Sequence, residues 1–146
     1  IGGILGGAKT TDAHHLYEFG KNIGIAFQLQ DDILDVYGDS AKFGKQVGGD
    51  ILSNKKTFLL LSAFELAKGE ILKELKSWVD KKNFIAEEKV AAITDIYTKL
   101  SIRKIAENKM HEYHQKAMHH FNALAVNTEK KAMLLQFSES LLVREI

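Results

Sequence analysis

Apolar residues recur along most of the chain at intervals of three and four, the spacing that places them on one face of an α-helix. Leu59, Leu60, Ala63, Phe64 and Ala67 show this pattern clearly. Proline, which interrupts helices, does not occur in the 146 residues. The pattern therefore predicts an all-α fold.

Start and stop signals divide the pattern into separate predicted helices. The first and longest runs from Thr10, which opens a Thr-Thr-Asp start signal, to Gly38, a residue type that commonly ends helices. Residues 39–54 hold three glycines and mixed charges without periodicity, so they are predicted to form a loop. The other predicted helices cover approximately residues 56–67, 69–81, 86–100, 102–124 and 128–144.

Length and composition narrow the class of protein. A chain of 146 residues with 45% hydrophobic residues suffices for the core of one domain. The 20 lysines and arginines nearly balance the 19 acidic residues, which argues against a dedicated nucleic-acid surface. Cysteine is absent, which excludes disulfides and thiolate metal sites and favours a cytoplasmic location.

No apolar run approaches the roughly 20 residues that span a bilayer, so we expect no transmembrane segment. The start has no basic region of the kind that opens a signal peptide. The chain opens at Ile1 in an apolar, glycine-rich segment without an initiator Met. We therefore interpret the chain as part of a longer protein.

An acidic stripe interrupts the apolar pattern of the long predicted helix. In the segment IAFQLQDDILDVYGD, at about 100° per residue, Gln28, Asp31, Asp32 and Asp35 fall within one narrow sector. A solvated helix face is the ordinary interpretation of a charge cluster. However, like charges four residues apart destabilise a helix, and no lysine lies three or four residues from any of these aspartates. Hard carboxylate oxygens suit Mg²⁺, which is the alternative interpretation.

The predicted loop after this helix supplies positive charge. Lys45, Lys55 and Lys56 follow the acidic stripe in sequence, and a further acid, Asp50, lies between them. Carboxylates for a metal and lysines for an anion, on one helix and its own loop, indicate a site for a metal-bound phosphate or diphosphate. The alternative, that these lysines are merely solvated, stays open at this point.

Two stretches, YEFGKNIGIAFQLQDDILDVYGD and GKQVGGDILSNKKT, resemble the second aspartate-rich region of trans-isoprenyl diphosphate synthases. These enzymes form the polyprenyl synthetase family, which includes farnesyl and geranylgeranyl diphosphate synthases. The resemblance is concentrated in residues 17–57, and beyond them it is limited to the helical layout and an arginine near the C-terminus. The matching positions are Gly20, Gly24, Phe27, Gln28, the DDxxD pattern of Asp31, Asp32 and Asp35, the pair Gly44-Lys45, Asp50 and Lys55.

The resemblance implies a fold and a function. The fold is a helical bundle of the isoprenoid synthase type, of which residues 1–146 would be the C-terminal portion of a single domain. The N-terminal half would be absent, because the family's first aspartate-rich motif lies upstream of any residue present here. The function is that of a Mg²⁺-dependent prenyltransferase, a homodimer that condenses an allylic diphosphate with isopentenyl diphosphate into a longer trans-polyprenyl diphosphate.

The resemblance also implies roles for individual residues. Asp31 and Asp35 would be the direct Mg²⁺ ligands, and Asp32 and Asp50 would support the metal shell through water. On this basis Asp31 and Asp35 are also expected to be essential for catalysis.

The substrate would be held by different residues. Lys45 and Lys55 would hold the allylic diphosphate and assist its departure. Gln28 would line the cavity near the reacting carbons, with Phe27 beside it. The residues that cap this cavity in the family lie beside the absent first motif. The sequence therefore makes no prediction of product length.

Three other interpretations of the sequence fit it less well. Another class I terpenoid synthase, such as a cyclase, would use similar metal chemistry but is expected to lack the pattern of Lys45 and Lys55. A non-catalytic subunit or helical interaction module derived from the family would have no physical reason to keep clustered like charges. The segment GILGGAKT suggests a phosphate-binding P-loop, but Ala8 separates its glycine from its lysine and no strand precedes it.

The histidines suggest a zinc site only weakly. Glu107, His111 and His114 could share one helical face, but a structural zinc site needs a fuller set of ligands. The neighbouring pair His119 and His120 adds no stronger signal, so we interpret these histidines as surface or core residues.

Overall fold

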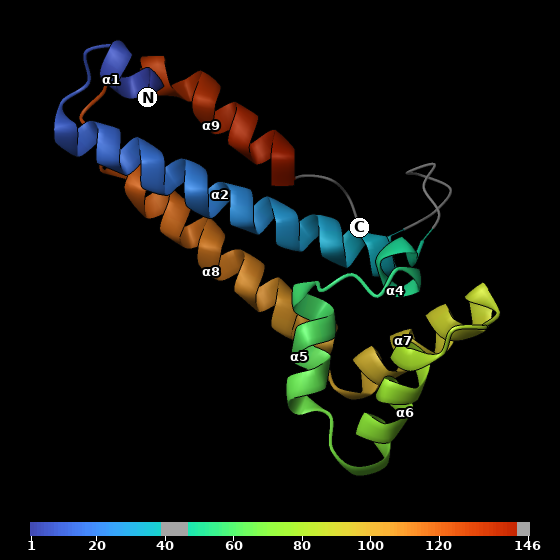
Figure 1. Cartoon of the computed structure of the whole chain (residues 1–146). Helices are drawn as coiled ribbons and strands as arrows, with labels where there is room; N and C mark the ends of the chain where they lie inside the picture. Colours follow the sequence, from blue (N-terminus) through green and yellow to red (C-terminus); the bar gives the residue numbers. More distant parts are fainter. Residues whose placement is uncertain (39–46, 143–146) are drawn as a thin grey trace. The chain divides into compact units, whose positions relative to one another are not determined.

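The computed structural model describes residues 1–38 and 47–142, and these residues form helices joined by turns and short connections (Figure 1). No strand occurs in these two ranges, so the predicted all-α class is confirmed. None of the helices in the described part is long and apolar enough to cross a membrane. The helices are α1 (Gly2–Leu5), α2 (Thr10–Tyr37), α4 (Gly49–Leu52), α5 (Phe58–Leu66), α6 (Gly69–Asp80), α7 (Ala86–Lys99), α8 (Ile102–Asn122) and α9 (Thr128–Leu142).

The chain divides into two compact units. Unit 1 comprises Ile1–Gln30 and Lys109–Glu145, and unit 2 comprises Asp31–Asn108. The division falls inside α2 and α8, so each of these helices contributes turns to both units. The three aspartates of the predicted acidic stripe and Lys55 belong to unit 2, whereas Gln28 belongs to unit 1.

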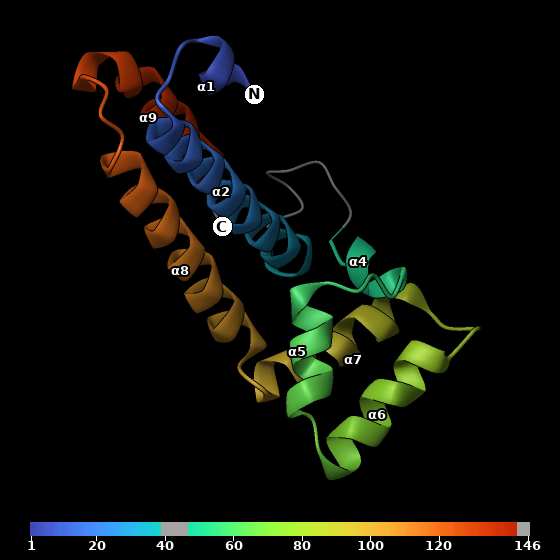
Figure 2. The same cartoon turned by 60° about the vertical axis from the view of Figure 1, so that its left-hand side comes forward.

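Unit 1 is built around the first part of α2 and the second part of α8, which lie side by side (Figures 1 and 2). Phe19 of α2 and Phe121 of α8 are buried, and their ring centroids lie 5.4 Å apart. The Asp12 carboxylate accepts a hydrogen bond of 2.9 Å from the backbone N–H of Ala125, beyond the end of α8. These contacts join segments that are more than 100 residues apart in sequence.

Unit 2 packs the last turns of α2 against α5, α6 and α7. Leu59, Leu75 and Ile96, one from each of these three helices, are completely buried in its core. Ile33 and Val36 of α2 belong to the same core, at 1% and 7% exposure. Because a helix is rigid, burying these two side chains determines the rotation of α2 about its axis and hence the directions of its aspartates.

Most predicted helix boundaries agree with the structure to within about two residues. The predicted loop at residues 39–54 was wrong for Gly49–Leu52, which form the short helix α4. Gly48 precedes it with a left-handed φ of 87°, and buried Ile51 anchors it to the core. A single turn this short has too few residues to show a period, so only its packing reveals it. Residues 39–46 and the predicted helix end at residue 144 lie outside the described residues.

Candidate active site

The acidic stripe occupies the last turns of α2, as the sequence predicted. Asp31 and Asp35 are half-buried, and Asp32 is buried, with 5% of its surface exposed. A buried carboxylate needs a charged or hydrogen-bonding partner, because transfer of an unpaired charge out of water is costly. Asp32 and Asp35 find such partners in α4 and in the turn that follows it.

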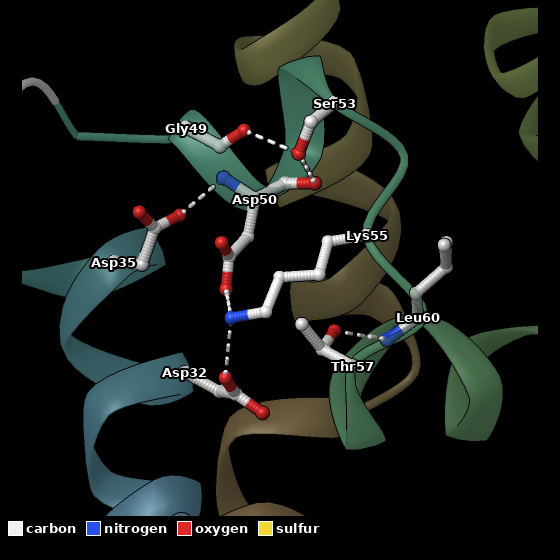
Figure 3. A network of polar contacts seen from close by, with 8 residues as sticks. All are labelled: Asp32, Asp35, Gly49, Asp50, Ser53, Lys55, Thr57 and Leu60. Atoms are coloured by element: carbon white, nitrogen blue, oxygen red, sulfur yellow. Dashed lines mark hydrogen bonds and ion pairs between the residues drawn. The ribbon is translucent and has the colours of Figure 1, made fainter.

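The start of α4 docks on Asp35. The backbone N–H of Asp50 donates a hydrogen bond of 2.9 Å to Asp35 Oδ2 (Figure 3). The N–H of Gly48 donates one of 2.6 Å to the backbone carbonyl of Asp35. A Cβ added to Gly49 would lie 3.3 Å from Asp35 Oδ1. Glycine at this position therefore lets the α4 backbone approach the carboxylate closely.

Lys55 joins the two acidic segments. Its Nζ lies 3.2 Å from Asp32 Oδ1 on α2 and 2.7 Å from Asp50 Oδ2 on α4, as Figure 3 shows. The Lys55 side chain is 49% exposed, whereas that of Asp32 is only 7% exposed. A lysine ammonium has three N–H donors, and these two carboxylates use two of them. The third can donate to an anion that approaches from solvent.

Local hydrogen bonds hold the backbone on both sides of Lys55. Its N–H donates to the carbonyl of Asp50 at 3.0 Å, and its own carbonyl accepts from the N–H of Thr57 at 2.7 Å. Thr57 is the N-cap of α5, where its Oγ1 accepts a bond of 3.2 Å from the N–H of Leu60 (Figure 3). Lys55 thus lies in a short, well-bonded connection between two helices.

The electrostatics of the cluster favour the binding of cations. Burial raises the pKa of Asp35, and the nearby charges of Asp50 and Asp32 raise it further, although the hydrogen bond from Asp50 N–H and the charge of Lys55 oppose the shift. The pKa of Lys55 is also raised, chiefly because its ammonium donates a hydrogen bond to Asp50. A cation bound beside Asp35 would relieve the repulsion that Asp50 and Asp32 exert on its carboxylate.

Comparison with known proteins identifies the family. The model of the polyprenyl synthetase family matches residues 1–97, which is more than half of the chain. The chain belongs to the polyprenyl synthetase family. The family resemblance inferred from the two sequence stretches is therefore confirmed.

Named relatives cover nearly all of this chain. It is 31% identical to the geranylgeranyl diphosphate synthase of Sulfolobus acidocaldarius over 99% of its own length and 43% of that protein. It is 30% identical to the corresponding synthase of Methanosarcina mazei, over 99% of this chain and 42% of that one. The chain thus spans less than half the length of these curated relatives.

Solved structures confirm the fold. A crystal structure of a geranylgeranyl pyrophosphate synthase matches with a TM-score of 0.86 and 35% identity, over 99% of this chain and 45% of that one. For the fold alone, a polyprenyl synthetase from Streptomyces coelicolor matches with a TM-score of 0.85 and 24% identity, over 96% of this chain and 43% of that one. The all-α isoprenoid synthase fold expected from the sequence is therefore present.

The structure brings some of the predicted site residues together. Asp32, Asp35, Asp50 and Lys55 meet in unit 2 through the contacts described above. Lys45, predicted to hold diphosphate, lies outside the described residues, as does its neighbour Gly44.

The two predicted cavity residues lie earlier on α2. Phe27, which is half-buried, and Gln28, which is exposed, belong to unit 1, and both make contacts within the protein. Their assignment to the substrate cavity stays a prediction.

The donor set is compatible with Mg²⁺. In the described part of the chain, no three or more histidine or acidic side chains are arranged to hold a metal by themselves. Mg²⁺ does not need such a cage, because it usually takes one or two carboxylates and completes its shell with water and substrate phosphates. Asp31 and Asp35 would supply these carboxylates. Asp35 Oδ2 accepts the bond from Asp50 N–H, and a Cβ at residue 49 would lie only 3.3 Å from Oδ1, so glycine at this position avoids crowding the second oxygen.

Four of the six histidines gather elsewhere, in unit 1. His15 Nδ1 lies 3.0 Å from His120 Nδ1, and the rings of His14 and His119 lie against the ring of His120. No local pattern links His14 and His15 to this cluster, because the contact between His15 and His120 joins residues 105 positions apart.

Sequence reasoning missed two residues that shape the site. Thr57 caps α5, and a threonine just before an apolar helical run was a readable N-cap signal. Asn54 adopts a left-handed φ of 51° directly before Lys55. Asparagine is one of the few residue types that tolerate this conformation. An asparagine close to a glycine-rich segment therefore indicates a turn, but less strongly than Thr57 indicates an N-cap.

Proposed function

We propose that the full-length protein is a Mg²⁺-dependent prenyltransferase that condenses an allylic diphosphate with isopentenyl diphosphate into a longer trans-polyprenyl diphosphate. The observation that carries the proposal is Lys55, whose half-exposed side chain bridges carboxylates from α2 and α4 and keeps one ammonium donor that these two contacts do not use. Several relatives bear the names farnesyl, geranylgeranyl or short chain isoprenyl diphosphate synthase, which supports the reaction class.

The charge of the site explains why metal and diphosphate would bind together. The aspartates at positions 31, 32 and 35 of α2 and at position 50 of α4 are acidic, and Lys55 pairs with two of them, Asp32 and Asp50. A diphosphate approaching this cluster unaccompanied would be repelled. Divalent cations held by Asp31 and Asp35 would reverse this balance, so the proposal requires diphosphate binding to depend on Mg²⁺.

The proposed reaction breaks the allylic C–O bond, and the diphosphate leaves with the bonding electrons. The double bond of isopentenyl diphosphate then forms the new C–C bond with the allylic cation, and loss of a proton restores a double bond. When bound, Mg²⁺ would supply electrostatic stabilisation of the leaving diphosphate. Lys55 would donate a charge-assisted hydrogen bond to the same group, and Asp32 and Asp50 would hold that ammonium in place beforehand.

The other proposed features follow from the family resemblance. Lys45 would assist Lys55, and Phe27 and Gln28 would line the cavity that receives the hydrocarbon chain. We further propose a cytoplasmic homodimer. A class I cyclase is disfavoured because it is expected to lack the pattern of Lys45 and Lys55. The ion pairs of Lys55 with two acidic segments support a role for this lysine in the site. A non-catalytic subunit is disfavoured because it would retain the electrostatic cost of clustered carboxylates without use.

The test replaces the proposed metal ligands in the full-length natural protein. Asp31→Ala and Asp35→Asn should lower the rate of chain elongation by about 100-fold or more, as removal of a charge-stabilising group typically does. Asn is chosen at position 35 because its side-chain oxygen can still accept the hydrogen bond from Asp50 N–H. Elongation is measured with Mg²⁺, an allylic diphosphate and isopentenyl diphosphate, and folding is checked by circular dichroism.

A matched control is Asp95→Ala. Asp95 lies on α7, is 57% exposed and pairs with Lys99 at the surface. This variant should elongate at the wild-type rate. Wild-type activity in either Asp31→Ala or Asp35→Asn would contradict the assignment of the metal ligands, and absence of elongation by the wild-type protein would contradict the proposed function.

A further inference from the structure

Lys89 is a buried lysine on α7 with an unusual set of partners. It is completely buried, and in the described part of the chain its ammonium forms no ion pair with a carboxylate. Its Nζ lies 2.7 Å from Asn54 Oδ1 and 3.5 Å from the carbonyl of Leu52, and 4.2 Å from the centre of the Phe84 ring. Its strongest contact is therefore a hydrogen bond to a neutral amide in the turn before Lys55.

Asn54 is held at both ends of its amide. Oδ1 accepts from Lys89 on α7, and Nδ2 donates a hydrogen bond of 3.0 Å to the carbonyl of Val79, near the end of α6. The residue has a left-handed φ of 51°, a conformation that costs free energy for any residue other than glycine. The two hydrogen bonds hold this turn in place between α6 and α7.

The turn determines where Lys55 lies. Lys55 follows Asn54 directly, its N–H bonds to the carbonyl of Asp50, and its Nζ reaches Asp32 and Asp50. A change in the backbone angles of Asn54 would move the start of the Lys55 side chain. Because the Lys55 Nζ contacts are hydrogen bonds of 2.7 to 3.2 Å, a displacement of about 1 Å would break at least one of them.

Stability does not account for a lysine at position 89. Burial of an ammonium without a charged partner is unfavourable, and burial lowers the pKa of Lys89 for this reason. Its neighbours on the same face of α7, Ile93, Ile96 and Tyr97, are all buried, so an apolar side chain would suit this position. An apolar side chain would avoid the cost of burying the ammonium, and this gain would offset the loss of one hydrogen bond to Asn54. What the lysine adds is the hydrogen bond to Asn54.

We propose that Lys89 is a positioning residue for Lys55 and acts through the side chain of Asn54. The inference rests on the proposed function, because it assigns to Lys89 the task of holding the diphosphate-binding ammonium at its place between α2 and α4. Lys89 itself is too deeply buried to touch a substrate. Its effect on the reaction would be indirect, through the backbone of residues 54 and 55.

The first variant is Lys89→Met in the full-length natural protein, which retains the length of the side chain but removes the donor. We expect kcat to fall by about 10- to 100-fold, because small displacements of a positioned group have effects of this size. The thermal unfolding midpoint should be unchanged or higher. A purely structural role predicts the opposite combination, which is an unchanged kcat of the folded protein and a lower unfolding midpoint. Lys76→Met, at an exposed position of α6, is the matched control and should leave both values unchanged.

The second variant is Asn54→Gly, which allows the left-handed backbone but removes both side-chain hydrogen bonds. If Lys89 acts through Asn54, the double variant should have the same kcat as the more impaired single variant. Independent effects would instead multiply, so a product of the two reductions would overturn the proposal.

Hydrogen exchange at the Lys55 amide provides a readout that does not depend on activity. The hydrogen bond from this amide to the Asp50 carbonyl should open more readily in Lys89→Met, so the amide should exchange faster than in the wild type. Wild-type exchange together with wild-type kcat in Lys89→Met would overturn the proposal. If the wild-type protein fails to elongate any substrate, the proposed function is wrong, and the exchange rate still decides whether Lys89 positions Lys55.

Discussion

At the scale of single residues, the Lys55 ammonium connects the described acidic groups of the candidate site. Asp32 is nearly buried, and Lys55 is its ion-pair partner across 23 residues of sequence. The same ammonium bonds to Asp50 at 2.7 Å, so one side chain neutralises part of the charge on two helices. Lys55 therefore has two roles, one in the folded structure and one in the proposed binding of diphosphate.

These two roles predict the behaviour of Lys55→Ala in the full-length protein. Affinity for an allylic diphosphate analogue in the presence of Mg²⁺ should fall, and kcat should fall by about 100-fold, because a donor to the leaving group is lost. Isothermal titration and steady-state kinetics measure the two effects. Lys45→Ala should act in the same direction according to the family resemblance.

The control for this prediction is Lys82→Ala. Lys82 is an exposed residue in the connection between α6 and α7, and its removal takes away the same formal charge. Equal losses of affinity in Lys82→Ala and Lys55→Ala would show that only the overall charge of the protein matters.

At the scale of secondary-structure elements, the short helix α4 links α2 to α7. Its first residues contact Asp35, and Gly48 before it packs against Val90 of α7. A Cβ on Gly48 would lie 2.6 and 2.9 Å from the two methyl carbons of Val90, and its φ of 87° also favours glycine. The position of α4, and therefore that of Asp50, depends on the absence of a side chain at residue 48.

Gly48→Ala should consequently displace α4. We expect a loss of about 1–3 kcal/mol in the free energy of unfolding, from overpacking and backbone strain together. Denaturant unfolding of the full-length protein measures this loss. Adding Val90→Ala should restore part of it by removing the clash, whereas the strained φ would remain. A Gly48→Ala variant as stable as the wild type would show that α4 shifts at no cost.

At the scale of the whole molecule, the chain corresponds to less than half of each full-length relative described above. Its described part contains one cluster of carboxylates in unit 2, whereas the family resemblance implies a second aspartate-rich motif upstream. That residues 1–146 form the C-terminal portion of a single synthase domain stays a prediction. It has a direct experimental consequence.

The 146-residue chain by itself should have no synthase activity. Transition-state stabilisation depends on preorganised groups in a site that excludes water, and each missing donor can raise the barrier by roughly 2.7 to 4 kcal/mol. The test incubates the purified chain with Mg²⁺, an allylic diphosphate and isopentenyl diphosphate and looks for an elongated product. The full-length protein is the positive control. Clear elongation by the 146-residue chain would contradict this prediction.

The amino-acid sequence by itself determined the helical class, most helix boundaries and the acidic face of α2. These features are readable because helix periodicity, N-caps and the 100° spacing of residues depend on neighbours within a few positions of the chain. The DDxxD pattern with Asp50 and Lys55 was readable in the same way, and it led to the correct family.

Only the tertiary structure decided which of these groups meet. It placed the Lys55 ammonium between Asp32 and Asp50, formed α4 where no period was visible, and buried Lys89 against Asn54, 35 positions earlier in the chain. The sequence places Lys89 on the same helical face as Ile93 and Ile96, but it does not show what lies opposite that face. Contacts of this kind depend on how separate helices pack, and no local pattern of residues specifies the partner that each side chain will find.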